Sequence, residues 1–105
     1  MMEFTAAQIA SLERLRDAGF TLAAFPMYAS HIGVKKGNCA ALLAPASGAG
    51  MQVYGEACYL VNGSLSVRVR RDGREWFVWK KEQLEATPER LAELARFREE
   101  LAALL

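Results

Sequence analysis

Apolar and polar positions alternate through residues 57–80, and this period of two predicts consecutive β-hairpins there. Asn62-Gly63 and Asp72-Gly73 are two-residue loops of the kind that supply the positive φ angles of a type I′ turn. Counting outward from the first loop pairs Val61 with Ser64, Leu60 with Leu65, Tyr59 with Ser66 and Cys58 with Val67. Counting outward from the second loop pairs Arg71 with Arg74, Arg70 with Glu75, Val69 with Trp76, Arg68 with Phe77, Val67 with Val78 and Ser66 with Trp79.

These registers sort the strand residues into two faces, because successive side chains of a strand point to opposite sides. The first face is apolar, and we predict that it is the core face: Cys58, Leu60, Leu65, Val67, Val69, Trp76 and Val78. The second face mixes aromatic side chains with arginine: Tyr59, Ser66, Arg68, Arg70, Glu75, Phe77 and Trp79. We expect the second face to be covered by another part of the molecule, or else to be used for binding.

Helix signals lie on both sides of these strands. A capping box at Thr5, with Gly19 as the stop signal, predicts a helix over residues 5–18. A second helix begins after Thr87, with Pro88 in its first position. Its apolar residues spread over an arc of about 180°, wider than the stripe of about 100° that one packed side requires. Either the first helix or another subunit must therefore lie against it.

Shorter apolar runs complete a predicted sheet. Residues 20–25 form one strand, and residues 31–44 form a hairpin that turns at Gly37-Asn38. Residues 51–61 form the next strand, with a β-bulge at Gly55. The predicted fold class is α+β: an N-terminal helix, an antiparallel β-meander of five to six strands, and a C-terminal helix packed on the sheet.

Composition indicates an ordinary globular protein. A chain of 105 residues, 52% hydrophobic and 24% charged, is expected to form a single domain over residues 1–105. A net charge of +1 provides no overall attraction to nucleic acid or to an anionic membrane. The sequence has neither a membrane-spanning apolar run nor the pattern of a signal peptide. We therefore expect a cytoplasmic protein without a membrane partner, in which both cysteines are reduced.

Candidate catalytic chemistry is sparse. His31 is the sole histidine, and its spacing to Cys39 and Cys58 matches no zinc pattern, so we expect no metal and no cofactor. Lys35 and Lys36 are close enough in sequence to lower the pKa of the Cys39 thiol. The predicted hairpin nevertheless separates Cys39 from His31 by about 16 Å. We therefore expect no catalytic residue, and a thiol enzyme using Cys39 is the weaker alternative.

The function that these features favour is a small, non-catalytic binding or assembly module that self-associates as a homodimer or binds a protein partner. The C-terminal helix supplies the candidate interface: Leu94, Phe97, Arg98, Leu101, Leu104 and Leu105. Within this arc we expect Arg98 to extend its charge into solvent rather than to pair with an acid or stack on an aromatic ring.

The alternative function is binding of single-stranded nucleic acid or an anionic ligand by the aromatic and arginine face. Its candidate residues are Tyr59, Arg68, Arg70, Phe77 and Trp79. Nucleic acid is less favoured than self-association, because the RNP-type sequences are absent and Glu75 opposite Arg70 reduces the positive charge.

Overall fold

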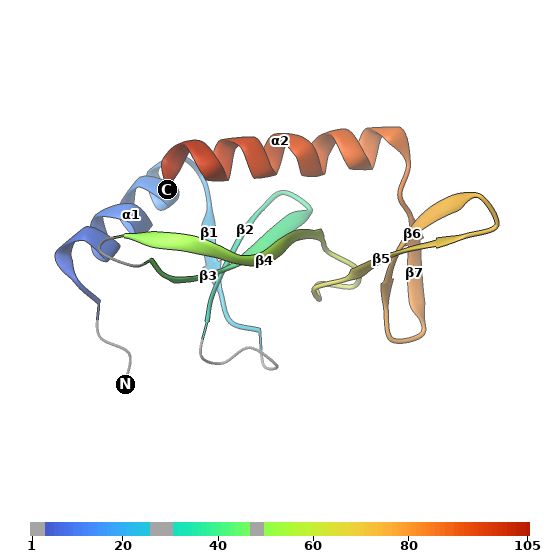
Figure 1. Ribbon diagram of the computed structural model, residues 1–105, viewed down its shortest axis with the longest axis horizontal. Coiled ribbons are helices and arrows are strands. Elements are labelled where there is room, and N and C mark those ends of the chain that lie inside the picture. Colours follow the sequence, from blue (N-terminus) through green and yellow to red (C-terminus); the bar gives the residue numbers. More distant parts are fainter. Residues whose placement is uncertain (1–3, 26–30, 47–49) are drawn as a thin grey trace.

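Two antiparallel sheets lie beneath a long C-terminal helix in the computed structural model, which describes residues 4–25, 31–46 and 50–105 (Figure 1). In chain order the elements are α1 (Ala6–Asp17), β1 (Thr21–Ala23), β2 (Ile32–Lys36), β3 (Cys39–Pro45), β4 (Met51–Tyr59), β5 (Val67–Arg71), β6 (Arg74–Trp79), β7 (Glu82–Glu85) and α2 (Pro88–Leu104). The first sheet has the order β1-β2-β3-β4 and the second the order β5-β6-β7. The α+β class and both helices are confirmed, and the single predicted meander is divided into two sheets.

The division occurs at the Asn62-Gly63 turn. Val61 and Ser64 exchange two backbone hydrogen bonds of 3.0 and 2.9 Å, and no further ladder follows. The Ser66 hydroxyl instead donates to the Tyr59 carbonyl oxygen at 2.6 Å. The predicted pairs of Leu60 with Leu65, Tyr59 with Ser66 and Cys58 with Val67 are therefore not formed, and β5 begins the second sheet instead of extending the first.

The second predicted hairpin is confirmed from the Arg71–Arg74 pair to the Val67–Val78 pair, but the predicted Ser66–Trp79 pair is not formed, because β5 begins at Val67. Asp72 and Gly73 both have positive φ, 52° and 74°, as a type I′ turn requires. β7, which pairs with β6 after a tight turn at Lys80-Lys81, was not predicted from the sequence. This turn lacks the glycine or asparagine that would have indicated it, although Lys80 has a positive φ of 53°.

The predicted core face of this hairpin is wrong. Val67, assigned to the core, has 67% of its surface exposed, whereas Phe77 on the opposite face has 1%. Tyr59 and Ser66 are buried on the same side as Phe77. Register determines which residues share a face, but the position of α2 and β4 determines which face is covered. Arg68 and Arg70 belong to the same face as Phe77, but both are exposed because they lie at its edge, where their charges stay in solvent.

The predicted helix ends are confirmed. Thr5 forms a capping box with Gln8 at the start of α1. Gly19 has a φ of 96°, and the Phe20 amide returns to the Leu15 carbonyl at 2.9 Å, which completes a Schellman motif. The Thr87 hydroxyl accepts from the Arg90 amide at 3.3 Å to cap α2.

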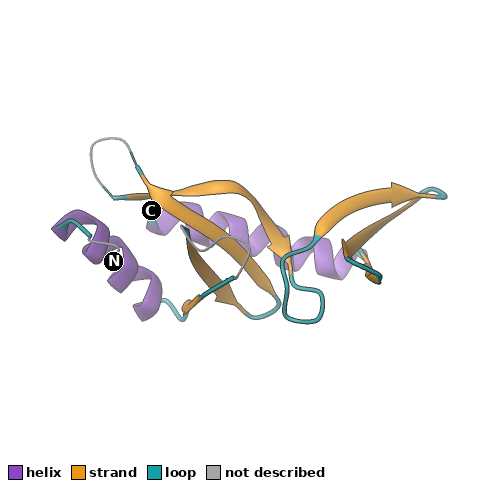
Figure 2. Cartoon of the chain, turned by 90° about the horizontal axis from the view of Figure 1, so that it is seen from below, coloured by secondary structure: helices purple, strands orange, loops and turns teal. Residues whose placement is uncertain are grey.

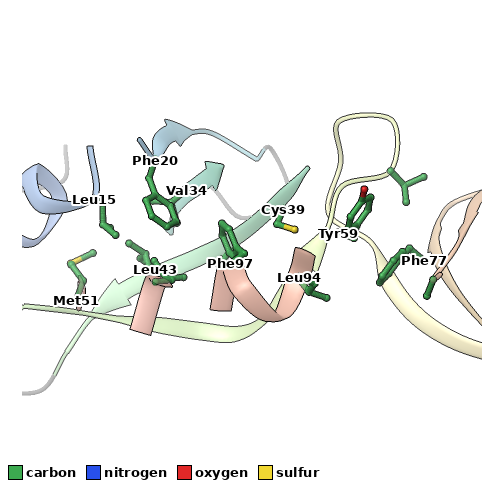
Figure 3. Close-up of a cluster of buried hydrophobic side chains, with 14 residues drawn as sticks. Leu15, Phe20, Val34, Cys39, Leu43, Met51, Tyr59, Phe77, Leu94 and Phe97 are labelled. Atoms are coloured by element: carbon green, nitrogen blue, oxygen red, sulfur yellow. The ribbon is translucent and has the colours of Figure 1, made fainter. Parts of the chain in front are cut away.

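The wide apolar arc of α2 is covered within the chain. α1 lies beside the end of α2, where the Arg14 side chain donates to the Leu104 carbonyl at 3.1 Å (Figure 1). Lys36 on β2 forms an ion pair with Glu100 of α2 at 2.7 Å. Leu94 and Phe97 are buried in the core that these elements enclose (Figure 3). Leu101 is buried in the same core. The first of the two expected covers, the N-terminal helix, is therefore present.

The molecule is elongated, with extents of 47 × 26 × 22 Å. Its radius of gyration is 14.3 Å, against about 13 Å expected for a compact chain of this length. Figure 2 shows the two sheets following one another along the long axis, with the second sheet at the N-terminal end of α2, rather than stacking face to face. Residues 45–50 separate the predicted hairpin from the next predicted strand, and they lie partly outside the described residues. No helix within the described ranges is long and apolar enough to cross a membrane.

Exchanging Phe77 for alanine tests the corrected face assignment. We expect Phe77→Ala to lower the free energy of unfolding by about 3–5 kcal/mol, because it leaves a cavity in a buried site. Val67→Ala is the matched control and should change that energy by less than about 0.5 kcal/mol, since the side chain is exposed. Urea denaturation followed by circular dichroism measures both. A larger loss for Val67→Ala than for Phe77→Ala would restore the original assignment.

Gly73 offers a second test, because a Cβ built there meets no neighbouring atom and only the backbone opposes it. We expect Gly73→Val to destabilise the protein by about 1 kcal/mol or more, since a β-branched residue at positive φ is strained. Arg74→Val, at the adjacent exposed strand position, should have little effect in the same denaturation experiment. Equal effects of the two substitutions would contradict a type I′ turn.

Candidate functional site

A cleft of about 970 Å³ opens where the two sheets meet below α2. One wall comes from β4 and from the connection between β4 and β5. The other walls come from the beginning of β5, the end of β6 and one side of α2. This volume lies at the upper end of the range of about 300–1,000 Å³ that is typical of small-molecule sites. The cleft is therefore large enough to hold a small molecule.

The β4 wall of the cleft is a strand edge. All six residues from position 53 to 58 line it, although neighbouring strand residues point to opposite faces. The cleft therefore runs along the outer edge of β4, which is the last strand of its sheet. Gly55, with a φ of 73°, lies in the predicted bulge, where the pairing between β3 and β4 shifts register.

Exposed apolar side chains gather in this cleft. Val53, Tyr54 and Val67 are three of the five large hydrophobic residues that are exposed in the described ranges, and all three line it. Leu94 and Leu101 of α2 supply part of the opposite wall. Such a concentration on a small monomer is typical of a surface that another molecule covers.

The base of the cleft joins the two sheets to α2. The rings of Tyr59 and Phe77 stack with centroids 5.0 Å apart and an interplanar angle of 11° (Figure 3). The Tyr59 hydroxyl donates to the Glu93 carboxylate at 3.2 Å, and the Asn38 amide donates to the same carboxylate at 3.2 Å. Burial, followed by the hydrogen bond to Glu93, raises the pKa of Tyr59. This network holds both sheets against one turn of α2.

Three cationic side chains line the cleft: Arg68, Lys80 and Arg98. The Arg68 guanidinium lies 3.8 Å from the Glu75 carboxylate, and the Lys80 ammonium lies 4.8 Å from the centroid of the Trp79 ring. Arg98 is exposed, as expected, and has no hydrogen bond, ion pair or ring contact with any described residue. Among the described residues, Glu56 is the only carboxylate that lines the cleft, so its charge is net positive.

Only some of the residues that we predicted for an anionic ligand line the cleft. Arg68 and Trp79 line the cleft. Phe77 also lines it but is almost fully buried, and Tyr59 is buried behind it. Arg70 is exposed and lies outside the cleft. The aromatic and arginine face is thus largely covered, and its open part is the end that holds Arg68 and Trp79.

The residues predicted for a subunit interface also differ in their exposure, and most of them are buried or partly buried within the chain. Leu94 and Leu101 reach the cleft while packing in the core, and Phe97 is buried entirely among core residues. Leu104 and Leu105 are partly buried against the core. Of the six candidates on this helix, Arg98 is the exposed one.

Three further cleft residues, Val53, Tyr54 and Lys80, were not predicted from the sequence. Val53 and Tyr54 belong to an ordinary strand pattern, and only the order of strands shows that their edge is open. Lys80 belongs to the turn that was not predicted. The uncharged sequence of residues 51–55 gave no signal of an open edge, because natural edge strands more often carry charges.

Both cysteines are free thiols in environments that oppose ionisation. Cys39 is fully buried, and burial raises its pKa to about 12, the reverse of the effect expected from the neighbouring lysines. Lys36 is engaged elsewhere, with the Ala18 carbonyl at 2.8 Å and with Glu100. Cys58 lines the cleft, and burial raises its pKa as well. Within the described ranges no three His, Cys, Asp or Glu residues are grouped to hold a metal ion.

Comparisons with protein-family models, curated proteins and solved structures gave no match, so the geometry of the cleft carries the functional interpretation.

Thiol labelling tests this placement. We expect Cys58 to react slowly with a disulfide reagent in the native protein and Cys39 to react only after unfolding in urea. Cys58→Ser should therefore show no native reactivity, whereas Cys39→Ser should keep it. Rapid labelling of Cys39 at neutral pH would contradict its burial and revive the thiol-enzyme alternative.

The same burial has a consequence at alkaline pH. The pKa of Cys39 rises from 9.0 to about 12 on folding, so its stabilising contribution is complete below pH 9 and is lost as the pH rises toward 12. Cys39→Ala should show a smaller loss of stability than the unmodified chain across that interval.

Proposed function

We propose that the protein is a small, non-catalytic binding module whose cleft takes an amphipathic anion, meaning a molecule with an apolar body and a carboxylate or similar group. The observation that carries this proposal is the combination of apolar walls with three cations, of which Arg98 has no partner among the described residues.

The apolar walls support the hydrophobic part of such a ligand. Val53, Tyr54 and Val67 are exposed to water in the free chain, and a hydrocarbon placed against them removes that surface from solvent. Each buried methylene group contributes about 0.8 kcal/mol. A chain of several methylene groups therefore supplies enough free energy for binding without a specific polar contact.

The cations support the anionic end. A guanidinium beside apolar side chains forms stronger hydrogen bonds to a carboxylate than it does at a fully solvated surface. Arg98 is available for this role because no ion pair with a described residue has to be broken before it binds an anion. Arg68 has only a long contact of 3.8 Å with Glu75 to give up.

Single-stranded nucleic acid has less support than a small anion. Its binding would need aromatic rings open for base stacking, and Tyr59 and Phe77 stack on each other in the core. We also propose a cytoplasmic location, because Cys39 and Cys58 are unpaired thiols and a reducing compartment maintains that state.

Dodecanoate, used below its micelle concentration, is a suitable probe. In a Trp76→Phe background Trp79 is the single tryptophan, and we expect its fluorescence to change as dodecanoate fills the cleft. Arg98→Gln should weaken binding about tenfold, because a charge-assisted hydrogen bond is lost. Arg70→Gln is the matched control, since this arginine lies outside the cleft.

Two outcomes oppose the proposal. Equal affinity for dodecanoate and for the cationic dodecyltrimethylammonium would show that the cations do not select the ligand. An oligothymidylate that binds with the same dependence on Arg98, while dodecanoate does not bind, would favour the nucleic-acid alternative instead.

A further inference from the structure

Four strand edges are open in the described part of the molecule, two on each sheet. They belong to β1 and β4 in the first sheet and to β5 and β7 in the second. β1 has only three residues, which is too short for a stable pairing. β4 has nine, and no described strand pairs with its outer side. An open edge of that length is a site for strand addition.

Charge distinguishes β4 from the two edges of the second sheet. β5 carries Arg68, Arg70 and Arg71, and β7 carries Glu82 and Glu85. In a two-fold pairing each strand meets an identical copy of itself. Two β5 strands would oppose arginine with arginine, and two β7 strands would oppose glutamate with glutamate, so both edges repel themselves. Residues 51–55 of β4 contain no charge and have no such barrier.

We propose that a second copy of this chain pairs with the β4 edge, antiparallel and about a two-fold axis near Val53. This pairing joins the two four-stranded sheets of the dimer into one continuous sheet. It converts Val53 and Tyr54 from exposed side chains into cross-strand contacts. The bulge at Gly55 ends the paired segment, because it breaks the regular spacing of backbone donors and acceptors.

The dimer retains the general expectation of self-association but moves its surface from α2 to β4. Its surface includes Val53 and Tyr54, which the proposed ligand would also contact, so the partner strand and the hydrocarbon of a ligand should compete for these two side chains. Val67, Arg68, Trp79 and Arg98 lie at other walls of the cleft, outside the paired segment. A strand pair of this length buries less surface than a standard stable interface, so we expect a dissociation constant in the roughly micromolar range.

Size-exclusion chromatography with light scattering measures the assembly. We expect a mass approaching twice 11.6 kDa as the concentration rises above the micromolar range. Tyr54→Lys should raise the dissociation constant about 100-fold, because it places like charges next to each other across the axis. Leu22→Lys on the β1 edge is the matched control, since Leu22 and Tyr54 are 52% and 51% exposed, and it should leave the dimer intact.

Cross-linking tests the surface independently of any effect on folding. In a Cys58→Ser background, Val53→Cys should form a disulfide-linked dimer under mild oxidation and Leu22→Cys should not. A mass of 11.6 kDa at 100 micromolar, or faster cross-linking through Leu22→Cys than through Val53→Cys, would overturn the proposal. Loss of dodecanoate binding alone leaves the dimer prediction standing, so the two proposals fail separately.

Discussion

The stack of Tyr59 on Phe77 is the contact on which the relation between the two sheets depends. The chain between β4 and β5 supplies a single bridge, from Val61 to Ser64, and no ladder across the junction. The stacked rings (Figure 3) therefore supply side-chain packing between the two sheets at this junction. Glu93 links this stack to α2 by accepting a hydrogen bond from the Tyr59 hydroxyl. Without it, the second sheet would be connected to the first mainly through the backbone and the beginning of α2.

Dividing the strands between two sheets also creates the surfaces that we interpret as functional. A continuous meander would pair β4 with β5 and close the edge of each strand. The separation instead leaves β4 open, exposes Val53 and Tyr54, and places Arg68 and Arg98 around the resulting cleft. The buried side of the second sheet supplies the base of this cleft. Binding and self-association are therefore proposed from one structural cause, the early end of the first hairpin.

Part of the candidate site was accessible from sequence and part was not. Arg68, Trp79 and Arg98 could be selected because local periodicity places them beside aromatic or apolar neighbours. Val53 and Tyr54 could not, because an edge strand and a central strand can share the same pattern. Cys39 was considered as a reactive thiol from its neighbouring lysines, but its pKa depends on burial, which is a property of the assembled core.

The sequence by itself determined the features that depend on neighbours along the chain: both helix caps, the Schellman motif at Gly19, the Asp72-Gly73 turn and the register of β5 with β6. Each follows from φ preferences and hydrogen bonds within a few residues. Only the tertiary structure decided which face of that hairpin is buried, how far the ladder after Asn62-Gly63 extends, and which edge of β4 stays open. Those outcomes depend on which surfaces, distant in sequence, pack against α2. The alternation of side chains along a strand does not reveal this, because the pattern is the same whichever face is covered.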